Sequence, residues 1–388
     1  MGKLKKLVCF VLMLGLAALL LSGCGGSSDS SGKIKIGLNY ELSGDNATYG
    51  QDCVDGILMA FEEINKAGGL LGKQIEPIKM DNKSDSAEAI SVATRLITQD
   101  KVVAILGPAT SGPFMAQIPI ATQHKVPVMS ASTTAEYVTM DENGNVKEYA
   151  FRICFKDSFQ GTLMANFALE KLNATKAVIV FDNTNDYSLG LKKSFTETFT
   201  SKGGTIVAEE AFVTKETDFN AILTRIKGLE FDVIFLPGYY QEAGPFIKQA
   251  RALEINHPIL GADGFDSADL VALAGASALN DIYFSNHYSS LDKDPKVLEF
   301  IENFKKKAGK DPNAFHALGY DLGYFVADAI KRANSDNAEK IKDALAATSE
   351  FKGVTGTVKI DEKHDAIKSA VIIELQNGEQ VSATKFSP

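Results

Sequence analysis

The chain is poor in the residues on which catalysis and metal binding usually depend. Its 388 residues include no tryptophan, four cysteines and five histidines. The histidines show no metal-ligand spacing, and the sequence contains neither a GxSxG nor an HExxH motif. These absences argue against a hydrolase and a catalytic metal centre, so we expect no metal, no cofactor and no enzymatic activity.

Cysteine is also too scarce for a disulfide framework. Only Cys53 and Cys154 lie beyond residue 24. We expect Cys53 on a helix, Cys154 in a strand, and neither of them in a nucleophile-like turn. Pairing in an oxidising compartment is the alternative, but we predict two buried free thiols.

Only one long apolar run is present, and it spans residues 7–21. It follows three lysines, and it is too short for a comfortable bilayer span but has the proportions of a signal peptide. The run ends in Leu21-Ser22-Gly23-Cys24, which resembles a bacterial lipobox, in which Cys24 would carry the lipid and become the mature N-terminus. A signal anchor with a chance cysteine is the alternative.

We therefore expect a lipoprotein signal peptide over residues 1–23 and a flexible Gly/Ser tether over 24–32. The tether would hold the folded body outside the cytoplasm, lipid-anchored to the cell membrane. Without residues 1–23 the chain has 37 basic and 49 acidic residues, a net charge of −12. Such acidity argues against nucleic acid as a partner.

From residue 33 onward, short β-branched runs alternate with helical patterns, which is typical of βαβ units. The first series predicts strands at 34–38, 75–80, 102–106 and 126–129 and helices near 49–67, 86–98 and 113–124. The second predicts strands at 177–181, 205–209, 233–236 and 258–261 and helices near 160–172, 189–201, 219–227 and 241–253. The tail predicts helices near 296–307, 315–332 and 338–347 and strands at 357–360 and 370–375.

Two successive series of similar size predict an α/β fold with two doubly wound parallel-sheet lobes. Parallel strands end at a common sheet edge, so the ligand-facing loops should lie at the carboxyl ends of the strands. A cleft between the lobes is then the natural binding site. Composition leaves open which lobe each tail element joins.

The first helix and the loop before it carry features of a known family. Residues 37–44 form the loop, Tyr49-Gly50 opens the helix, and residues 56–69 end it in Gly68-Gly69. The chain resembles the leucine/isoleucine/valine-binding proteins of ABC transporters over essentially all of 33–375. That resemblance implies the type I periplasmic-binding-protein fold, in which several strands form a hinge between the lobes.

The resemblance also implies how the chain divides between the lobes. The N-terminal lobe would comprise 33–156 plus about 287–369. The C-terminal lobe would comprise 157–286 plus about 370–388. These bounds assign the tail elements that composition alone leaves unassigned.

The turn at 107–112 (GPATSG) joins a predicted strand to the next helix. Such a turn would point free backbone N–H groups and a hydroxyl at a carboxylate over the helix N-terminus. It lacks the Lys-Ser/Thr ending of a phosphate-binding P-loop, and Ser111 as a plain N-cap is the local alternative. The family resemblance implies that Ser111 binds a ligand carboxylate.

A second hydroxyl-rich segment, 128–134 (VMSASTT), ends the following strand. Polar groups at the carboxyl end of a strand suit ligand binding, although a solvated turn is the alternative. The resemblance implies that the Ser132 backbone carbonyl accepts from a ligand ammonium and that Thr134 donates to its carboxylate.

In the second lobe, three strand ends bring tyrosines and a carboxylate toward one edge. A ligand ammonium needs an anionic acceptor, and Asp263 is the candidate. The resemblance implies that Tyr187 and Tyr239 close over the ligand, whereas packing is the usual role of a tyrosine at a strand end.

Three more positions are implied by the resemblance. Asp157 would approach the ammonium side, with a helix N-cap as the equally good alternative. Tyr49 and Phe315 would line the side-chain pocket. Ala109 stands where branched-chain binders carry a larger apolar residue, which leaves room for a larger ligand.

We predict an extracytoplasmic, monomeric amino-acid-binding component of an ABC importer, which delivers a free L-amino acid to a membrane permease. The expected side chain is branched-chain aliphatic. The alternatives are an aromatic amino acid, a small amide or urea, or a short peptide. A lipid-anchored ligand sensor with the same fold is the rival of another class.

Overall fold

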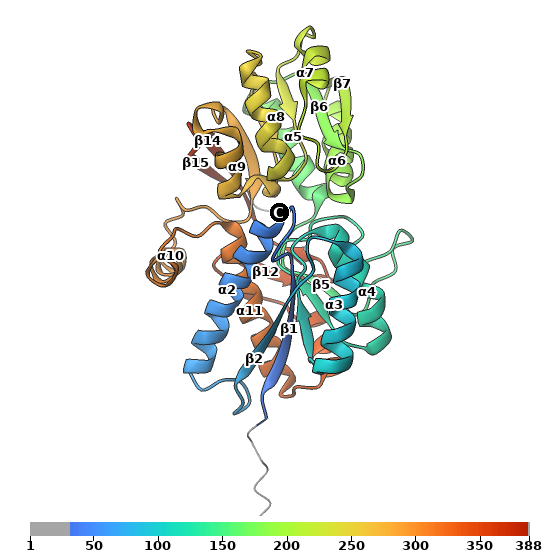
Figure 1. The fold of residues 1–388 in the computed structure, drawn as a ribbon, viewed down its shortest axis with the longest axis vertical. Helices are drawn as coiled ribbons and strands as arrows, with labels where there is room; N and C mark the ends of the chain where they lie inside the picture. Colours follow the sequence, from blue (N-terminus) through green and yellow to red (C-terminus); the bar gives the residue numbers. More distant parts are fainter. Residues whose placement is uncertain (1–31, 387–388) are drawn as a thin grey trace, which may run out of the picture.

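The computed structural model describes residues 32–386. The predicted signal peptide, Cys24 and all of the predicted tether except residue 32 lie outside this range. Two bodies, each built around a sheet, lie one above the other (Figure 1). Within 32–386, no helix combines the length and the apolar character needed to cross a membrane.

The lower body in Figure 1 is built on a five-stranded parallel sheet of order β2-β1-β3-β4-β5. Its strands are β1 (Ile34–Tyr40), β2 (Ile75–Asp81), β3 (Ala104–Leu106), β4 (Val128–Ser130) and β5 (Ala150–Arg152). The helices that follow them are α2 (Ala47–Lys66), α3 (Ser86–Arg95) and α4 (Ser111–His124). Central strands such as β3 and β4 are buried throughout, as expected for a sheet covered on both faces.

The upper body is built on a seven-stranded sheet of order β15-β14-β10-β9-β8-β6-β7. Its parallel strands are β6 (Lys176–Asp182), β7 (Thr205–Phe212), β8 (Val233–Phe235), β9 (Ile259–Gly261) and β10 (Ile282–Asn286). Antiparallel β14 (Ala370–Gln376) and β15 (Glu379–Phe386) complete one edge. The helices are α5 (Asp157–Glu170), α6 (Asp186–Ser201), α7 (Asn220–Lys227), α8 (Tyr240–Ala252) and α9 (Ala268–Ala274).

The remaining tail elements lie between β10 and β14 in sequence. They are α10 (Pro295–Ala308), α11 (Ala314–Ala333), α12 (Ala338–Ala346) and the small antiparallel sheet of β11 (Phe351–Gly353), β12 (Gly356–Ile360) and β13 (Ala366–Ile367). Helix α11 packs closely against α2 at glycines. A Cβ atom added to Gly56 of α2 would lie only 2.1 Å from the His316 carbonyl oxygen of α11. A Cβ on Gly319 would lie equally close to the Cys53 carbonyl oxygen, so this close helix crossing requires glycine on both sides.

The chain passes between the two bodies three times. It leaves the first sheet after β5, leaves the second after β10, and returns to the second through the segment that joins β13 to β14. Three connecting segments restrict relative motion to hinge bending. The predicted α/β class with two doubly wound lobes and a multi-strand hinge is confirmed.

Some local predictions were wrong. Strands β10 and β15 and helix α9 were not predicted, because α9 and β10 are short and the edge strand β15 is mostly polar and exposed, so each carries little periodic hydrophobic signal. Cys53 lies on α2 as expected, but Cys154 lies two residues beyond the end of β5 rather than within a strand. Both thiols are free and buried, as predicted.

Candidate functional site

The carboxyl ends of the strands in both sheets meet at a small cavity between the two bodies. Seven of the nine sequence-predicted ligand residues line it: Tyr49, Ser111, Ser132, Tyr187, Tyr239, Asp263 and Phe315. Its free volume is about 10 Å³, roughly the space at which a cavity begins to hold one water molecule. Any amino acid therefore requires these side chains or the lobes to move.

The turn before α4 forms the first-lobe wall, and a buried carboxylate beneath it was missed at the sequence level. Glu41 accepts hydrogen bonds from the N–H groups of Ala109 and Thr110 at 2.9 and 3.0 Å and from the Thr110 hydroxyl at 2.5 Å. The sequence predicted that backbone N–H groups of this turn would be free to bind a ligand. For Ala109 and Thr110 that prediction was wrong, because Glu41 accepts from both N–H groups. Burial raises the pKa of Glu41. The carboxylate instead fixes the shape of the turn.

Ser111 is the first residue of α4, and the N-cap position is Thr110, so Ser111 is not the plain N-cap. Its hydroxyl accepts from the Ala135 N–H at 3.2 Å and lines the cavity. The Ser132 hydroxyl donates to the Ala109 carbonyl at 2.7 Å, which joins the two hydroxyl-rich segments. The first wall is thus a set of linked hydroxyls and backbone groups.

Thr134 and Asp157 are buried beside the cavity but do not line it. The Asp157 N–H donates to the Thr134 carbonyl at 2.8 Å across the first crossing segment. Asp157 is the first residue of α5 after the Lys156 N-cap, so the N-cap alternative is wrong. A Cβ on Gly190 would lie 2.9 Å from Asp157 Oδ2, so this carboxyl faces α6. Burial raises its pKa well above the usual range.

Asp263 dominates the second-lobe wall. Its Oδ1 accepts from the Tyr187 hydroxyl at 2.7 Å and from Gln160 Nε2 at 3.1 Å, and its Oδ2 lies 3.3 Å from His287 Nε2. Hydrogen bonds to a carboxylate offset the cost of its burial. The acceptor that the sequence proposed for an ammonium is therefore held by three side chains.

Gln160 and His287 were missed at the sequence level. Gln160 Oε1 accepts from the Asp263 N–H at 3.2 Å and from the Ser285 hydroxyl at 2.7 Å, which ties α5 to β10. The His287 ring stacks on Phe155 with centroids 3.6 Å apart. Burial lowers the pKa of His287 to about 4, so at neutral pH the ring is neutral and donates through Nε2. No short motif marks either residue.

Aromatic side chains from both lobes fill the remaining space. Tyr49 stacks on Phe315 with centroids 4.4 Å apart, and Tyr187 stacks on Tyr239 at 4.9 Å. The Tyr49 hydroxyl donates to the Gly264 carbonyl across the cleft. Burial raises the pKa of these tyrosines, so their hydroxyls stay protonated and can donate.

Polar contacts at the cleft rim hold the lobes together. The Tyr240 hydroxyl donates to the Asp45 carbonyl at 3.1 Å, and Lys215 Nζ lies 2.8 Å from Asp45 Oδ2. The Thr48 hydroxyl bonds Asp269 on α9. The described arrangement is therefore a closed one.

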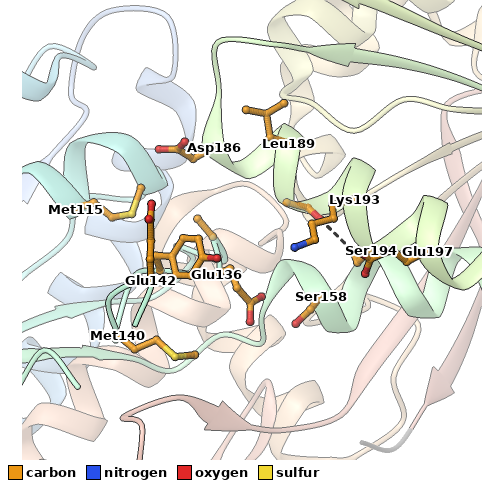
Figure 2. Close-up of a pocket in the computed structure, with 13 residues that line it drawn as sticks. Met115, Glu136, Met140, Glu142, Ser158, Asp186, Leu189, Lys193, Ser194 and Glu197 are labelled. Carbon is orange, nitrogen blue, oxygen red and sulfur yellow. Dashed lines mark hydrogen bonds between the residues drawn. The ribbon is translucent and has the colours of Figure 1, made fainter. Parts of the chain in front are cut away.

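Two other features lie outside the interlobe cavity. A wider groove of about 640 Å³ lies between the loop at 135–142 and α6, and none of the predicted ligand residues line it. Figure 2 shows the residues that do. Asp52, Asp55 and His316 form a group with metal-ligand spacing. The Lys310 ammonium lies 3.2 Å from Asp52 and 3.6 Å from Asp55, so this group already has its cation.

Two hinged, doubly wound lobes that enclose a site at their strand ends define a type I periplasmic-binding-protein fold. The chain belongs to the periplasmic binding protein family, whose model matches residues 33–380. A leucine-, isoleucine-, valine-, threonine- and alanine-binding protein of Pseudomonas aeruginosa is 28% identical over 350 residues, which cover 90% of this chain and 91% of that protein.

Two solved structures are also similar. One is the branched-chain amino acid transporter substrate-binding protein of Streptococcus pneumoniae in complex with isoleucine, at 43% identity and a TM-score of 0.87, covering 92% of this chain and all of that one. The other is a leucine-binding protein of Thermotoga maritima, at 35% identity and a TM-score of 0.86, covering 92% and 99%.

Proposed function

We propose that this protein is the amino-acid-binding component of an ABC importer and that it binds a free, branched-chain aliphatic L-amino acid. The observation that carries the proposal is the pairing of two unlike walls around one interlobe cavity. Hydroxyls line the first wall, and a buried carboxylate lies in the second. An α-amino acid presents a carboxylate and an ammonium, which match donors and an anion respectively.

Each site residue has a role in this proposal. Ser111 and Thr134 would donate to the ligand carboxylate, and the Ser132 carbonyl would accept from the ammonium. Asp263 and Tyr187 would cover the ammonium from the second lobe, with Asp157 beside them. Tyr49, Tyr239 and Phe315 would surround the side chain, and their aromatic surface favours an apolar one. The relatives named for leucine and isoleucine support this choice.

Closure is the proposed mechanical step. A ligand that contacts both walls stabilises the closed arrangement, because only that arrangement offers both sets of contacts. Since the closed cavity holds about 10 Å³, ligand entry must separate Tyr49 from Tyr239 and Gly264. The membrane permease would recognise the closed, loaded form.

The lobe bounds and the anchor belong to the same proposal. The N-terminal lobe would comprise 33–156 plus about 287–369, and the C-terminal lobe 157–286 plus about 370–388. The three crossing segments support this division. The protein would act as a monomer outside the cytoplasm, held at the membrane by a lipid on Cys24, and it would carry out no chemical reaction.

Calorimetric titration of the purified, refolded protein tests the ligand. Isoleucine, leucine and valine should bind with one-to-one stoichiometry, and D-leucine should bind much more weakly. Phenylalanine, urea, acetamide and a dipeptide complete the panel. If any of these four binds more tightly than the branched-chain amino acids, the proposed ligand is wrong. If no amino acid binds, the proposed function is refuted.

A further inference from the structure

A second cavity, of about 480 Å³, lies at the hinge rather than between the strand ends. Its walls come from residues 287–289 after β10, from the turn at 353–357, and from residues 367–369 before β14. The first turn of α10 and Lys385 on β15 close it. Two of the three crossing segments therefore form parts of one cavity.

Lys368 is the most unusual group in this cavity, because its side chain is only 3% exposed. Its Nζ donates to the Thr355 hydroxyl at 2.7 Å, and within 32–386 no carboxylate lies within 4.0 Å of it. Asp321 faces it, but that carboxylate already accepts from the Val354 and Thr355 N–H groups and the Thr355 hydroxyl at 2.7–2.8 Å. A buried ammonium without a direct counterion is costly.

The other charged groups in the lining are also mainly cationic. Lys296, Lys352 and Lys385 join Lys368, and three hydroxyls can contribute donors: Ser289, Thr357 and Ser369. Lys352 also lies 3.5 Å from Glu350. This concentration of positive charge stands out, because residues 24–388 carry a net charge of −12.

Two carboxylates, Asp292 and Asp294, share the lining, and each is engaged locally. Asp292 Oδ1 accepts from the Asp294 N–H at 2.9 Å, and Asp294 Oδ1 accepts from the Lys296 N–H at 2.8 Å as the N-cap of α10. Neither carboxylate forms an ion pair with Lys368. The lining therefore carries four lysines against two carboxylates, and the Asp321 carboxylate behind Lys368 offsets only part of this positive charge.

We propose that this hinge cavity binds a small multivalent oxyanion of the phosphate class, with Lys368 as its buried contact. Lys385, Lys296 and Lys352 supply further positive charge at the rim, and the hydroxyls of Ser369 and Thr357 supply hydrogen bonds. Burial lowers the pKa of Lys368 to about 8, which still leaves most of its ammonium protonated at neutral pH.

Occupancy of this cavity also affects the amino-acid site, and this second step rests on the proposed function. His287 lines the hinge cavity and contacts Asp263 in the interlobe cavity. An anion that joins residues 287–289 to residues 367–369 favours the hinge arrangement seen in the closed form. Because coupling between two sites is reciprocal, the anion raises amino-acid affinity and the amino acid raises anion affinity by the same factor.

Calorimetric titration of the full chain with inorganic phosphate, in a chloride buffer of matched ionic strength and without amino acid, tests the site. One phosphate should bind saturably. Lys368→Met should weaken it at least tenfold, whereas Lys359→Met, an exposed lysine outside the cavity, should leave it unchanged. If Lys368→Met fails to fold, Lys385→Glu at the rim serves instead and should weaken phosphate binding about threefold or more.

Absence of saturable binding both to free phosphate and to vesicles containing phosphatidic acid, or binding unaffected by both Lys368→Met and Lys385→Glu, would overturn the site. Two further arms identify the source of the phosphate group. Binding to free phosphate but not to vesicles containing phosphatidic acid indicates a soluble anion, and the reverse indicates a lipid headgroup.

The coupling is tested by titrating isoleucine with and without saturating phosphate. Phosphate should raise isoleucine affinity about fivefold or more, at the lower end of typical coupling between sites. Lys368→Met should abolish that increase and leave isoleucine affinity in chloride unchanged. An unchanged affinity in the wild-type protein refutes the coupling. Phosphate binding without any amino-acid binding refutes the proposed function instead, so the two failures are distinguishable.

Discussion

The two walls of the interlobe cavity use opposite chemistry. The first-lobe wall consists of hydroxyls and a helix start, held in place from beneath by the buried Glu41. The second-lobe wall presents its carboxylate, Asp263, to the cavity, and Gln160 and His287 contact that carboxylate from behind. In one wall the anion is structural, and in the other it faces the cavity. Burial of a carboxylate therefore does not by itself mark a ligand-binding residue, because Glu41 and Asp263 are both buried and only Asp263 lines the cavity.

The strongest test of this comparison is Asp263→Asn, which keeps the size of the side chain and removes its charge. Amino-acid affinity should fall by about 2–5 kcal/mol, the usual cost of truncating one partner of a buried charge pair. That corresponds to a roughly thirtyfold to several-thousandfold rise in Kd by calorimetry. The exposed Asp281→Asn should change nothing. An unaltered Kd in Asp263→Asn removes the residue from the site.

The donors behind Asp263 should give the second wall an acid sensitivity. His287 has a folded-state pKa of about 4, below the ordinary value of about 6.5, so folding favours its neutral form. Its contribution to stability is complete above pH 6.5 and is lost as the pH falls to 4. The loss amounts to roughly 3 kcal/mol.

Urea unfolding at pH 7 and pH 4 measures this effect. His287→Gln should remove roughly that part of the acid destabilisation, whereas His124→Gln, at the end of α4, should keep it. Equal pH dependence in the wild-type protein and in His287→Gln would contradict the assignment.

The hydroxyl wall should respond more weakly than the carboxylate wall. Ser111→Ala should cost about 1.5–3 kcal/mol of amino-acid affinity, the usual contribution of a hydrogen bond to a charged group. Ser158→Ala, outside the interlobe cavity, is the matched control. A loss in Ser111→Ala as large as in Asp263→Asn would show that the walls contribute equally.

Glu41→Gln tests the structural carboxylate of the first wall. The variant side chain offers one acceptor atom where Glu41 offers two, so a buried N–H loses its partner at a cost of about 1–3 kcal/mol in unfolding free energy. Thermal unfolding should show a lower Tm, and Glu142→Gln in an exposed loop should not. Amino-acid affinity should also fall in Glu41→Gln, because the turn that carries Ser111 loosens. A loss of affinity without any loss of stability would mean that Glu41 contacts the ligand.

The residues of the interlobe cavity could be predicted from the sequence, whereas those of the hinge cavity could not. Ser111, Ser132, Tyr187 and Asp263 follow predicted strands, and the structure brings their side chains to one cavity as that placement implied. Lys368 carried no such signal, because it lies in a short connecting segment. Strands β10 and β15 were also missed, because which strands pair with each other depends on tertiary packing and not on the residues of one strand alone.

The sequence by itself determined the α/β class, the two series of elements and the strand ends at which a site could form. These features depend on local periodicity and on turn residues, which are properties of neighbouring positions. Only the tertiary structure decided that Gln160 and His287 hold Asp263, that Glu41 belongs to the turn rather than to the cavity, and that Lys368 is buried at the hinge. The partners of each lie far away in the chain, so their burial and hydrogen bonding follow from packing alone.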